Sequence, residues 1–206
     1  MRKIIFATGN EGKMKEIRMI LADLPVEVIS MKEAGLDVDI VEDGTTFEEN
    51  ALIKASAIHE RTGELVLADD SGLEVDYMDK APGVYSARFL GEDTSYAVKN
   101  QYIIDQLKDA SGKERSARFV CVIAAVFPDG TTKTCRGTIE GEIGYAPAGE
   151  NGFGYDPIFY VPEYGCSTAQ LPPEVKNKIS HRGKALEAMK TVIREYLVEN
   201  GEHTDK

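Results

Sequence analysis

Two adjacent acids, Asp69 and Asp70, follow the apolar run 65–68 and precede Ser71 and Gly72. An apolar run of this length is typical of a buried strand, and open α/β sheets bind their ligands at the ends of strands. Because neighbouring side chains of a strand point in opposite directions, we expect only one acid to face a site. A carboxylate there can hold a hard cation such as Mg²⁺ or accept a proton from water. The alternative interpretation is a polar turn in which Gly72 has a positive φ.

A polar segment with two glycines, residues 8–13, lies between an apolar run and a helical pattern. Glycines let backbone N–H groups approach an anion closely, and the following helix N-terminus offers unpaired donors. Lys13 adds a positive charge. The segment is not a P-loop, because Ala7 stands where that motif has its first glycine and Met14 replaces its Ser or Thr. An anion site and a simple strand-to-helix turn with a solvated lysine both fit this pattern.

A second acidic segment, residues 42–44, precedes a predicted helix that contains Lys54. Magnesium sites commonly combine one or two carboxylates with phosphate oxygens, so Glu42 can supply a second carboxylate to a metal held by Asp69 or Asp70. A solvated acidic loop and a surface lysine are the alternative interpretations for this segment and for Lys54.

Glycines flank an aromatic residue in the segment 149–157. Glycine on both sides of Phe153 would leave its flat ring open to a planar ligand. Asp156 could then accept N–H bonds from the edge of that ligand. The alternative is a structural turn with Phe153 buried.

A basic segment, residues 176–183, begins with Lys176 and overlaps the start of a predicted helix. Positive charge at a helix N-terminus opposes the helix dipole, and a bound anion would remove that conflict. A histidine considered alone is usually structural, but His181 and Arg182 beside Ser180 indicate ligand contact. Taken together, these segments indicate a nucleotide site: cations for phosphates, carboxylates for a metal and an aromatic ring for a base.

The elements that must position these residues follow from apolar patterning and from capping signals. Thr46 and Glu49 form a capping box, and residues 128–130 form the turn of a long hairpin. Strands alternating with helices predict an α/β protein with a mixed sheet. The predicted strands are 3–7, 26–29, 65–68, 117–127, 131–138 and 158–161, and the predicted helices include 14–21, 46–63, 94–107 and 180–201.

Length and composition limit the classes of function. The chain has 206 residues, enough for one large domain or two small lobes. Its net charge of −11 argues against a nucleic-acid polymer as partner, because binding to a phosphate backbone requires clustered Lys and Arg. The three cysteines lack metal-ligand spacing, and no run has the length of a signal peptide or a membrane span. We therefore predict a cytoplasmic protein that makes no membrane contact.

Six motifs occur in an order that identifies a family. On these motifs the chain resembles the inosine triphosphate pyrophosphatase (Ham1-like) family over nearly its whole length. One small departure is Gln170, where family members usually carry Glu. The motifs are Thr8-Gly9-Asn10-Glu11-Gly12-Lys13, Phe47-Glu48-Glu49-Asn50-Ala51, Ala68-Asp69-Asp70-Ser71-Gly72-Leu73, Gly83-Val84-Tyr85-Ser86-Ala87-Arg88, Gly152-Phe153-Gly154-Tyr155-Asp156-Pro157 and Ile179-Ser180-His181-Arg182-Gly183.

The resemblance implies a single pyrophosphatase domain over residues 1–206, with two lobes flanking a central active-site cleft, and a homodimer. It implies Mg²⁺-dependent hydrolysis of ITP, dITP and XTP to the nucleoside monophosphate and pyrophosphate, which clears deaminated purines from nucleotide pools. By position, Glu42 and Asp70 would hold Mg²⁺, and Asp70 would also activate the attacking water. Phe153 would stack on the base, while Asp156, His181 and Arg182 would read its edge. The full substrate-binding set is Thr8, Gly9, Asn10, Glu11, Gly12, Lys13, Lys54, Ser71, Phe153, Gly154, Tyr155, Asp156, Lys176, His181 and Arg182.

Two other functions use part of the same pattern. A non-catalytic purine nucleotide sensor could bind through the same loops, although paired acids add nothing to phosphate binding. A phosphatase acting on sugar phosphates could use the same carboxylates, although it needs no aromatic platform at Phe153. Release of pyrophosphate from ITP distinguishes all three.

Overall fold

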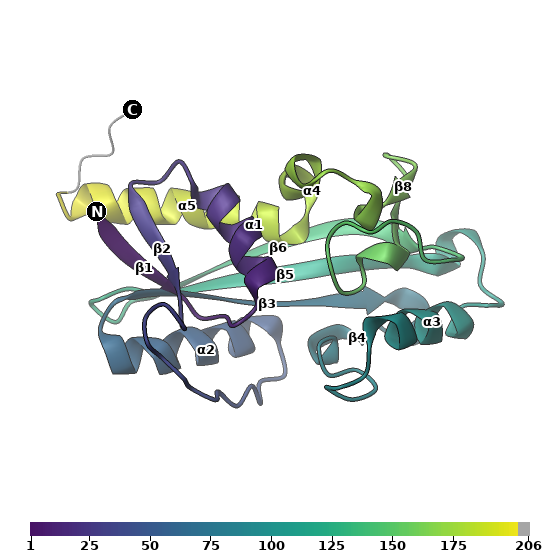
Figure 1. Cartoon of the computed structure of the whole chain (residues 1–206), viewed down its shortest axis with the longest axis horizontal. Helices are drawn as coiled ribbons and strands as arrows, with labels where there is room; N and C mark the ends of the chain where they lie inside the picture. Colours follow the sequence, from purple (N-terminus) through teal and green to yellow (C-terminus); the bar gives the residue numbers. More distant parts are fainter. Residues whose placement is uncertain (202–206) are drawn as a thin grey trace. The chain divides into compact units, whose positions relative to one another are not determined.

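A computed structural model describes residues 1–201 of the chain (Figure 1). These residues fold into two compact units. The first unit contains Met1–Asp70, Cys121–Gly137 and the segment from Arg182 onward, and the second contains Ser71–Val120 and Thr138–His181. The strands follow the order β2-β1-β3-β5-β6-β7-β8, with β4 paired to β3.

The first unit is built on parallel strands. β1 (Arg2–Phe6) pairs in parallel with β2 (Val26–Ser30) and with the start of β3 (Leu65–Val75). The later part of β5 (Ser116–Val126) and the first part of β6 (Thr132–Ile143) also belong to this unit. Its helices are α1 (Glu11–Leu21), α2 (Phe47–Thr62) and α5 (His181–Glu199) apart from His181.

Alternation along the strands separates two buried faces in this unit. Ile4 and Phe6 of β1 and Leu65 and Leu67 of β3 form one core with the apolar sides of α1 and α5. The intervening Val66 is also fully buried but lies outside that core. Figure 1 shows α1 and α5 on one side of these strands and α2 on the other. The face of β3 on which a side chain lies therefore decides which helices it meets.

The second unit uses mainly antiparallel pairing. The end of β3 pairs with β4 (Ala81–Pro82), and the end of β6 pairs with β7 (Phe159–Val161), which pairs with β8 (Cys166–Ser167). Its helices are α3 (Tyr96–Gln106) and α4 (Pro173–Ile179). The predicted α/β class with a mixed sheet is confirmed.

Helix limits agree with their capping signals. Thr46 caps α2 by accepting the backbone N–H of Glu49 at 3.1 Å, and Gly63 ends the helix with a φ of 68°. The Glu49 carboxylate accepts from the backbone N–H of Thr45 at 2.6 Å, one residue before the cap. This pattern satisfies N–H groups that the first turn leaves without helical partners.

Two local predictions were wrong. The strand predicted to end at Ala68 continues to Val75, so Asp69 and Asp70 lie inside an eleven-residue strand and not at its end. The alternative of a turn with positive φ at Gly72 is also wrong, because Gly72 lies in the strand and has no positive φ. A glycine after a run of polar residues is typical of a turn, but a strand that is paired with neighbouring strands can also contain such a segment.

The basic segment near residue 180 is also divided differently from the prediction. Lys176 and Lys178 lie in the last turn of α4, an element that the sequence pattern did not predict. Positive charge is favourable at a helix C-terminus, so these lysines do not oppose a helix dipole. Only His181 and Arg182 lie in the first turn of the final helix, α5.

Candidate functional site

The neighbouring acids Asp69 and Asp70 have different partners, as strand alternation requires. The Asp69 carboxylate is fully buried and lies 3.1 Å from Lys13 Nζ and 3.5 Å from a guanidinium nitrogen of Arg182. The same guanidinium pairs with Glu16 at 2.7 Å. Burial alone would raise the pKa of Asp69, but the charges of Lys13 and Arg182 outweigh it and hold that pKa well below its usual range. Asp69 is therefore ionised at neutral pH, and its charge compensates the positive charges of Lys13 and Arg182.

Asp70 is a carboxylate of the opposite kind. Burial raises its pKa to about 6, against the effect of nearby Lys54, and the negative charges of Glu42 and Asp69 raise it further. A hydrogen bond from Asn50 acts in the other direction. Its Oδ2 atom is buried and has no hydrogen-bond partner within residues 1–201. A carboxylate with a pKa near neutrality can accept a proton from water and release it again.

Helix α2 brings Lys54 and Asn50 to Asp70. Lys54 Nζ lies 2.9 Å from Glu42, and the same lysine has a raised pKa because nearby carboxylates outweigh the effect of its burial. The Asn50 side-chain oxygen accepts the backbone N–H of Gly44 at 2.9 Å, which fixes the segment that carries Glu42. A Cβ at Gly44 would lie 2.7 Å from that oxygen, so this close approach requires glycine.

Asn50 was not among the predicted site residues. It is almost fully buried on α2, a helix whose other buried side chains are Phe47, Ala51, Ala55 and Ile58. A polar residue on an otherwise apolar helix face is the signal that sequence reasoning passed over.

The carboxylates Asp70 and Glu42 fit a hard divalent cation. No group of three or more His, Cys, Asp or Glu side chains within residues 1–201 is arranged to hold a metal by itself. Magnesium sites commonly use one or two carboxylates and take further oxygens from substrate phosphates. The buried Asp70 Oδ2 without a partner, and the mutual repulsion of the two acids, are features that a bound cation would compensate.

The segment 8–13 folds as the predicted strand-to-helix connection. The Thr8 hydroxyl accepts the backbone N–H of Asn10, and the Asn10 side chain caps α1 by accepting the N–H of Lys13, both at 3.1 Å. Thr8 is buried, whereas Gly9, Asn10, Glu11 and Gly12 are exposed. Neither glycine has a positive φ, and a Cβ at Gly9 would meet no atom within 4 Å. The two glycines have no side chains to cover the backbone, and the segment 9–12 is exposed, so a ligand can reach its N–H groups.

In the second unit, an ion pair organises the glycine-rich segment around Phe153. The Asp156 carboxylate accepts the backbone N–H of Phe153 at 2.9 Å, Lys176 Nζ at 2.7 Å and the Thr168 hydroxyl at 2.7 Å. Lys176 Nζ also lies 4.9 Å from the centre of the half-buried Phe153 ring. Gly152 has a φ of 73°, and a Cβ there would clash with the Asp156 carboxylate. Phe153, Asp156 and Lys176 thus form one structural group, and the pairing of Asp156 with Lys176 is one that the sequence analysis did not predict.

Other predicted residues of the second unit have defined surroundings. The His181 ring stacks on Phe119, with centroids 4.7 Å apart and planes at 18°. Tyr155 is buried, and its hydroxyl donates to the carbonyl of Ser86 at 2.5 Å. Ser71 is partly exposed on β3, immediately after Asp70.

Arg182 is 2% exposed and belongs to the first unit, where it pairs with Asp69 and Glu16. The predicted site residues therefore form two groups, one in each unit. The first-unit group joins Lys13 and Arg182 through Asp69, and Lys54 joins Glu42 to Asp70. The second-unit group contains Phe153, Asp156 and Lys176.

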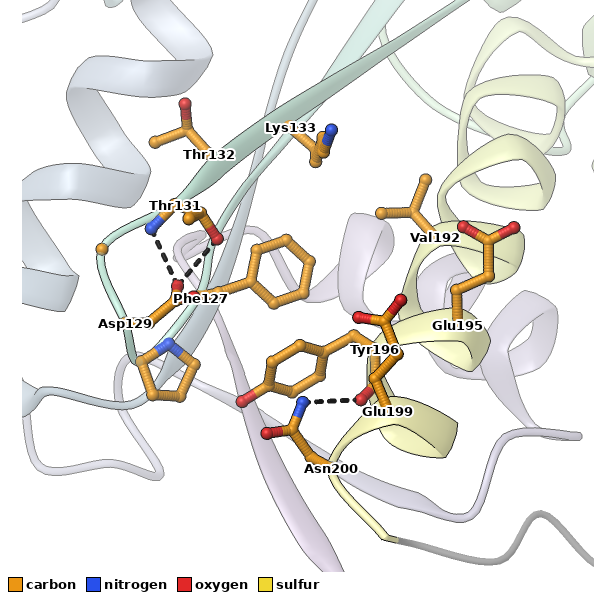
Figure 2. A pocket seen from close by; sticks show the side chains of 12 residues that line it. Phe127, Asp129, Thr131, Thr132, Lys133, Val192, Glu195, Tyr196, Glu199 and Asn200 are labelled. Carbon is orange, nitrogen blue, oxygen red and sulfur yellow. Dashed lines mark hydrogen bonds between the residues drawn. The ribbon is translucent and has the colours of Figure 1, made fainter.

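A surface pocket of about 1060 Å³ in the first unit contains none of these residues. It is lined by the hairpin between β5 and β6 and by the last turns of α5 (Figure 2). Figure 2 shows Phe127 beside Tyr196, with the carboxylates of Asp129, Glu195 and Glu199 around them and Lys133 nearby. An excess of carboxylates disfavours a triphosphate, so this pocket is not the candidate nucleotide site.

Comparison with known proteins identifies the family of this chain. The family model described as the Ham1 family matches residues 4–192. The chain belongs to the Ham1 family. This Ham1-family chain is 46% identical to a protein of Clostridium perfringens named dITP/XTP pyrophosphatase, with 96% of this chain and 100% of that protein covered. It is 49% identical to a protein of the same name from Desulforamulus reducens, with 95% and 98% covered.

Solved structures lead to the same family. The Ham1-family chain superposes on a HAM1 protein from Coxiella burnetii with a TM-score of 0.86 and 44% identity, covering 95% of this chain and 100% of that one. A Ham1 protein from Staphylococcus aureus gives a TM-score of 0.85 and 42% identity, with the same coverage. Nucleotide pyrophosphatases of this kind generally need a divalent metal. Within residues 1–201, none of the helices has the length and apolar character needed to cross a bilayer.

Proposed function

We propose that this Ham1-family protein hydrolyses non-standard purine nucleoside triphosphates, namely ITP, dITP and XTP, to the nucleoside monophosphate and pyrophosphate. The observation that carries the proposal is the pair of consecutive acids with opposite environments: Asp69 is neutralised by Lys13 and Arg182, and Asp70 has a pKa of about 6. A protein that only binds phosphates has no use for a proton acceptor at this position. The names of the relatives do not favour a sensor either.

The first-unit group is assigned to the triphosphate. The exposed backbone of residues 9–12 at the start of α1 and the positive charges of Lys13 and Lys54 suit phosphate oxygens. Asp70 accepts the proton of the attacking water, and Lys54, which stays protonated, helps to keep Asp70 largely ionised at neutral pH. Glu42 and Asp70 would hold Mg²⁺, which supplies charge neutralisation at the phosphates and a lower pKa for water when bound.

The second-unit group is assigned to the purine. The Phe153 ring offers a stacking surface, and Asp156 and Lys176 fix its backbone and approach one face of the ring. His181, stacked on Phe119, joins Ser71, Gly154 and Tyr155 of the same unit in the proposed set that selects the base. Donors aimed at O6 would favour a 6-oxo purine, since adenine would leave them unpaired at a cost of about 1–3 kcal/mol.

The experiment is hydrolysis of ITP in H₂¹⁸O with Mg²⁺, followed by identification of the products. We expect pyrophosphate and IMP, with the label in IMP, because attack at the innermost phosphorus puts the water oxygen there. Label in pyrophosphate would place the attack at another phosphorus, and release of orthophosphate would assign a different phosphohydrolase. Nucleotide binding without any product would indicate the sensor.

Oligomeric state and location complete the proposal. We propose that each chain is a single domain and that two chains form a homodimer. A mass measurement in solution tests the homodimer directly. The proposed location is the cytoplasm, and it is supported by the three cysteines, Cys121, Cys135 and Cys166, all of which are free.

A further inference from the structure

The loop that carries Phe153 is held from a second direction, by helix α3. The Asn100 side-chain amide donates to the carbonyl of Gly154 at 3.2 Å. A Cβ at Gly154 would lie 3.6 Å from the ring of Tyr96, which is one turn earlier on α3. The same ring meets Tyr155 edge-on, with centroids 5.1 Å apart and planes at 89°. The backbone immediately after Phe153 therefore rests on α3.

Helix α3 is itself anchored at the buried side that carries Asn100. Lys99 is 1% exposed, its Nζ donates to the carbonyl of Ala87 at 2.7 Å, and the same atom lies 4.7 Å from the centre of the Tyr96 ring. Burial lowers the pKa of Lys99. The hydroxyl of Tyr155 donates to Ser86, one residue before Ala87. These contacts form a closed set in which α3, the segment at 86–87 and the Phe153 loop fix one another.

The chemistry of Asn100 distinguishes it from a simple packing residue. Asn100 is 3% exposed, and its Oδ1 atom has no hydrogen-bond partner within residues 1–201. A buried acceptor left without a partner lowers stability, and an apolar side chain of similar size would avoid that cost. The favourable contribution of the amide at this position is its donation to Gly154.

We propose that Asn100 is a positioning residue for purine recognition: through the Gly154 carbonyl it sets the height and tilt of the Phe153 ring, without touching the substrate. This inference rests on the proposed function, because it assumes that Phe153 stacks on the base. A residue that acts only through the stacking surface affects the binding of a nucleotide. It leaves unchanged the binding of a ligand that has phosphates and no base.

The test compares ITP with inorganic pyrophosphate on the full-length enzyme. In Asn100→Leu we expect KM for ITP to rise about threefold to tenfold, the effect of losing one neutral hydrogen bond, with kcat changed less than about twofold. The inhibition constant of pyrophosphate, which has no base, should stay the same. Gln101→Ala is the matched control and should behave as the wild type. Gln101 is an exposed neighbour on α3 whose side chain donates to Asp105 on the same helix.

A further variant keeps the outcomes distinguishable. Phe153→Ala tests the proposed function, because loss of stacking should raise KM for ITP about tenfold or more. If Phe153→Ala leaves KM unchanged, the stacking assignment fails irrespective of Asn100. If Phe153→Ala raises KM and Asn100→Leu does not, the positioning role of Asn100 is overturned.

A parallel rise in KM and in the pyrophosphate inhibition constant would also overturn this role, because it shows a general loss of structure. If Asn100→Leu does not fold, Asn100→Ser carries the test. Its shorter hydroxyl cannot reach Gly154, and the same selective rise in KM is expected.

Discussion

Replacing Asp70 by asparagine should make this protein more stable and less active. The Asp70 carboxylate is 9% exposed, and the fold disfavours its charge. Asparagine has nearly the same shape and does not ionise. If Asp70 is the proton acceptor, kcat for ITP should fall by about 10²–10⁴. The gain in stability and the loss of activity have the same cause, namely that burial raises the pKa of this carboxyl group toward neutral pH.

The magnitude follows from the pKa of Asp70, which burial raises from 3.8 to about 6. At about 1.36 kcal/mol per pKa unit, ionising Asp70 costs the folded state about 3 kcal/mol relative to the unfolded chain. The folded protein binds this proton more tightly than the unfolded chain. The resulting contribution to stability is therefore fully present below the unfolded pKa and is lost as the pH rises through about 6. The asparagine variant does not undergo that loss.

The assay is chemical unfolding of wild type and Asp70→Asn without metal, between about pH 4 and pH 7.5. We expect the two free energies of unfolding to agree near pH 4 and to diverge by about 3 kcal/mol above neutral pH, with the variant more stable. Metal must be removed by a chelator, because a cation on Asp70 would stabilise the wild type alone.

Asp69→Asn is the matched control, because the same substitution one residue earlier should have the opposite sign. Asp69 compensates the buried charges of Lys13 and Arg182, so its removal should lower the free energy of unfolding by about 3–5 kcal/mol at neutral pH. That loss should stay nearly constant down to about pH 4 and shrink only below it, because the pKa of Asp69 is lowered from its usual value of 3.8. An Asp70→Asn variant that is no more stable than the wild type at neutral pH would refute the electrostatic reasoning. Two variants with shifts of the same sign would refute it as well.

Two other predictions concern the same charges, and a third concerns the buried side chain of Arg115. In the pH profile of kcat/KM for ITP, the acid limb should have its midpoint near pH 6 at low Mg²⁺, and this midpoint should move to lower pH as the Mg²⁺ concentration rises. A midpoint that does not change with Mg²⁺ would show that Asp70 does not bind the metal. Lys54→Met removes a positive charge that lowers the pKa of Asp70, so the same midpoint should move to higher pH, and an unchanged midpoint would contradict this pairing. Arg115 is 2% exposed and donates four hydrogen bonds to backbone carbonyls near the ends of α3 and β6. Its replacement by Met should lower the free energy of unfolding by about 3 kcal/mol or more. Calorimetry should show unchanged pyrophosphate binding in Arg115→Met, and weaker binding would give Arg115 a role beyond stability.

Much of the secondary structure was predictable because its signals are local. Thr46 and Gly63 mark the limits of α2 through chemistry within one turn of each end. The apolar runs at β1 and β5 identify buried strands with an error of one residue. The prediction failed where the same local sequence pattern is compatible with two structures. Gly72 after two acids reads as a turn, and only the pairing of neighbouring strands shows that β3 continues.

The site was predictable as a set of residue types, and less so as a set of roles. The motif that contains Asp69 and Asp70 is visible in the sequence, and alternation already requires that the two acids point apart. Which acid meets a pair of cations, and which meets Asn50 on α2, depends on the helix that covers each face of β3.

By itself, the sequence determined the family, the residue types of the site and most helix and strand limits, since these depend on the order of residues and on contacts within a turn. The tertiary structure alone decided that the charge of Asp69 is compensated by Lys13 and Arg182, while Asp70 has a pKa of about 6. It also decided that Asn100 supports the loop of Phe153 through Gly154. Burial, charge pairing and hydrogen bonding between segments far apart in the chain arise only when the elements pack, and these interactions give chemically similar residues different functions.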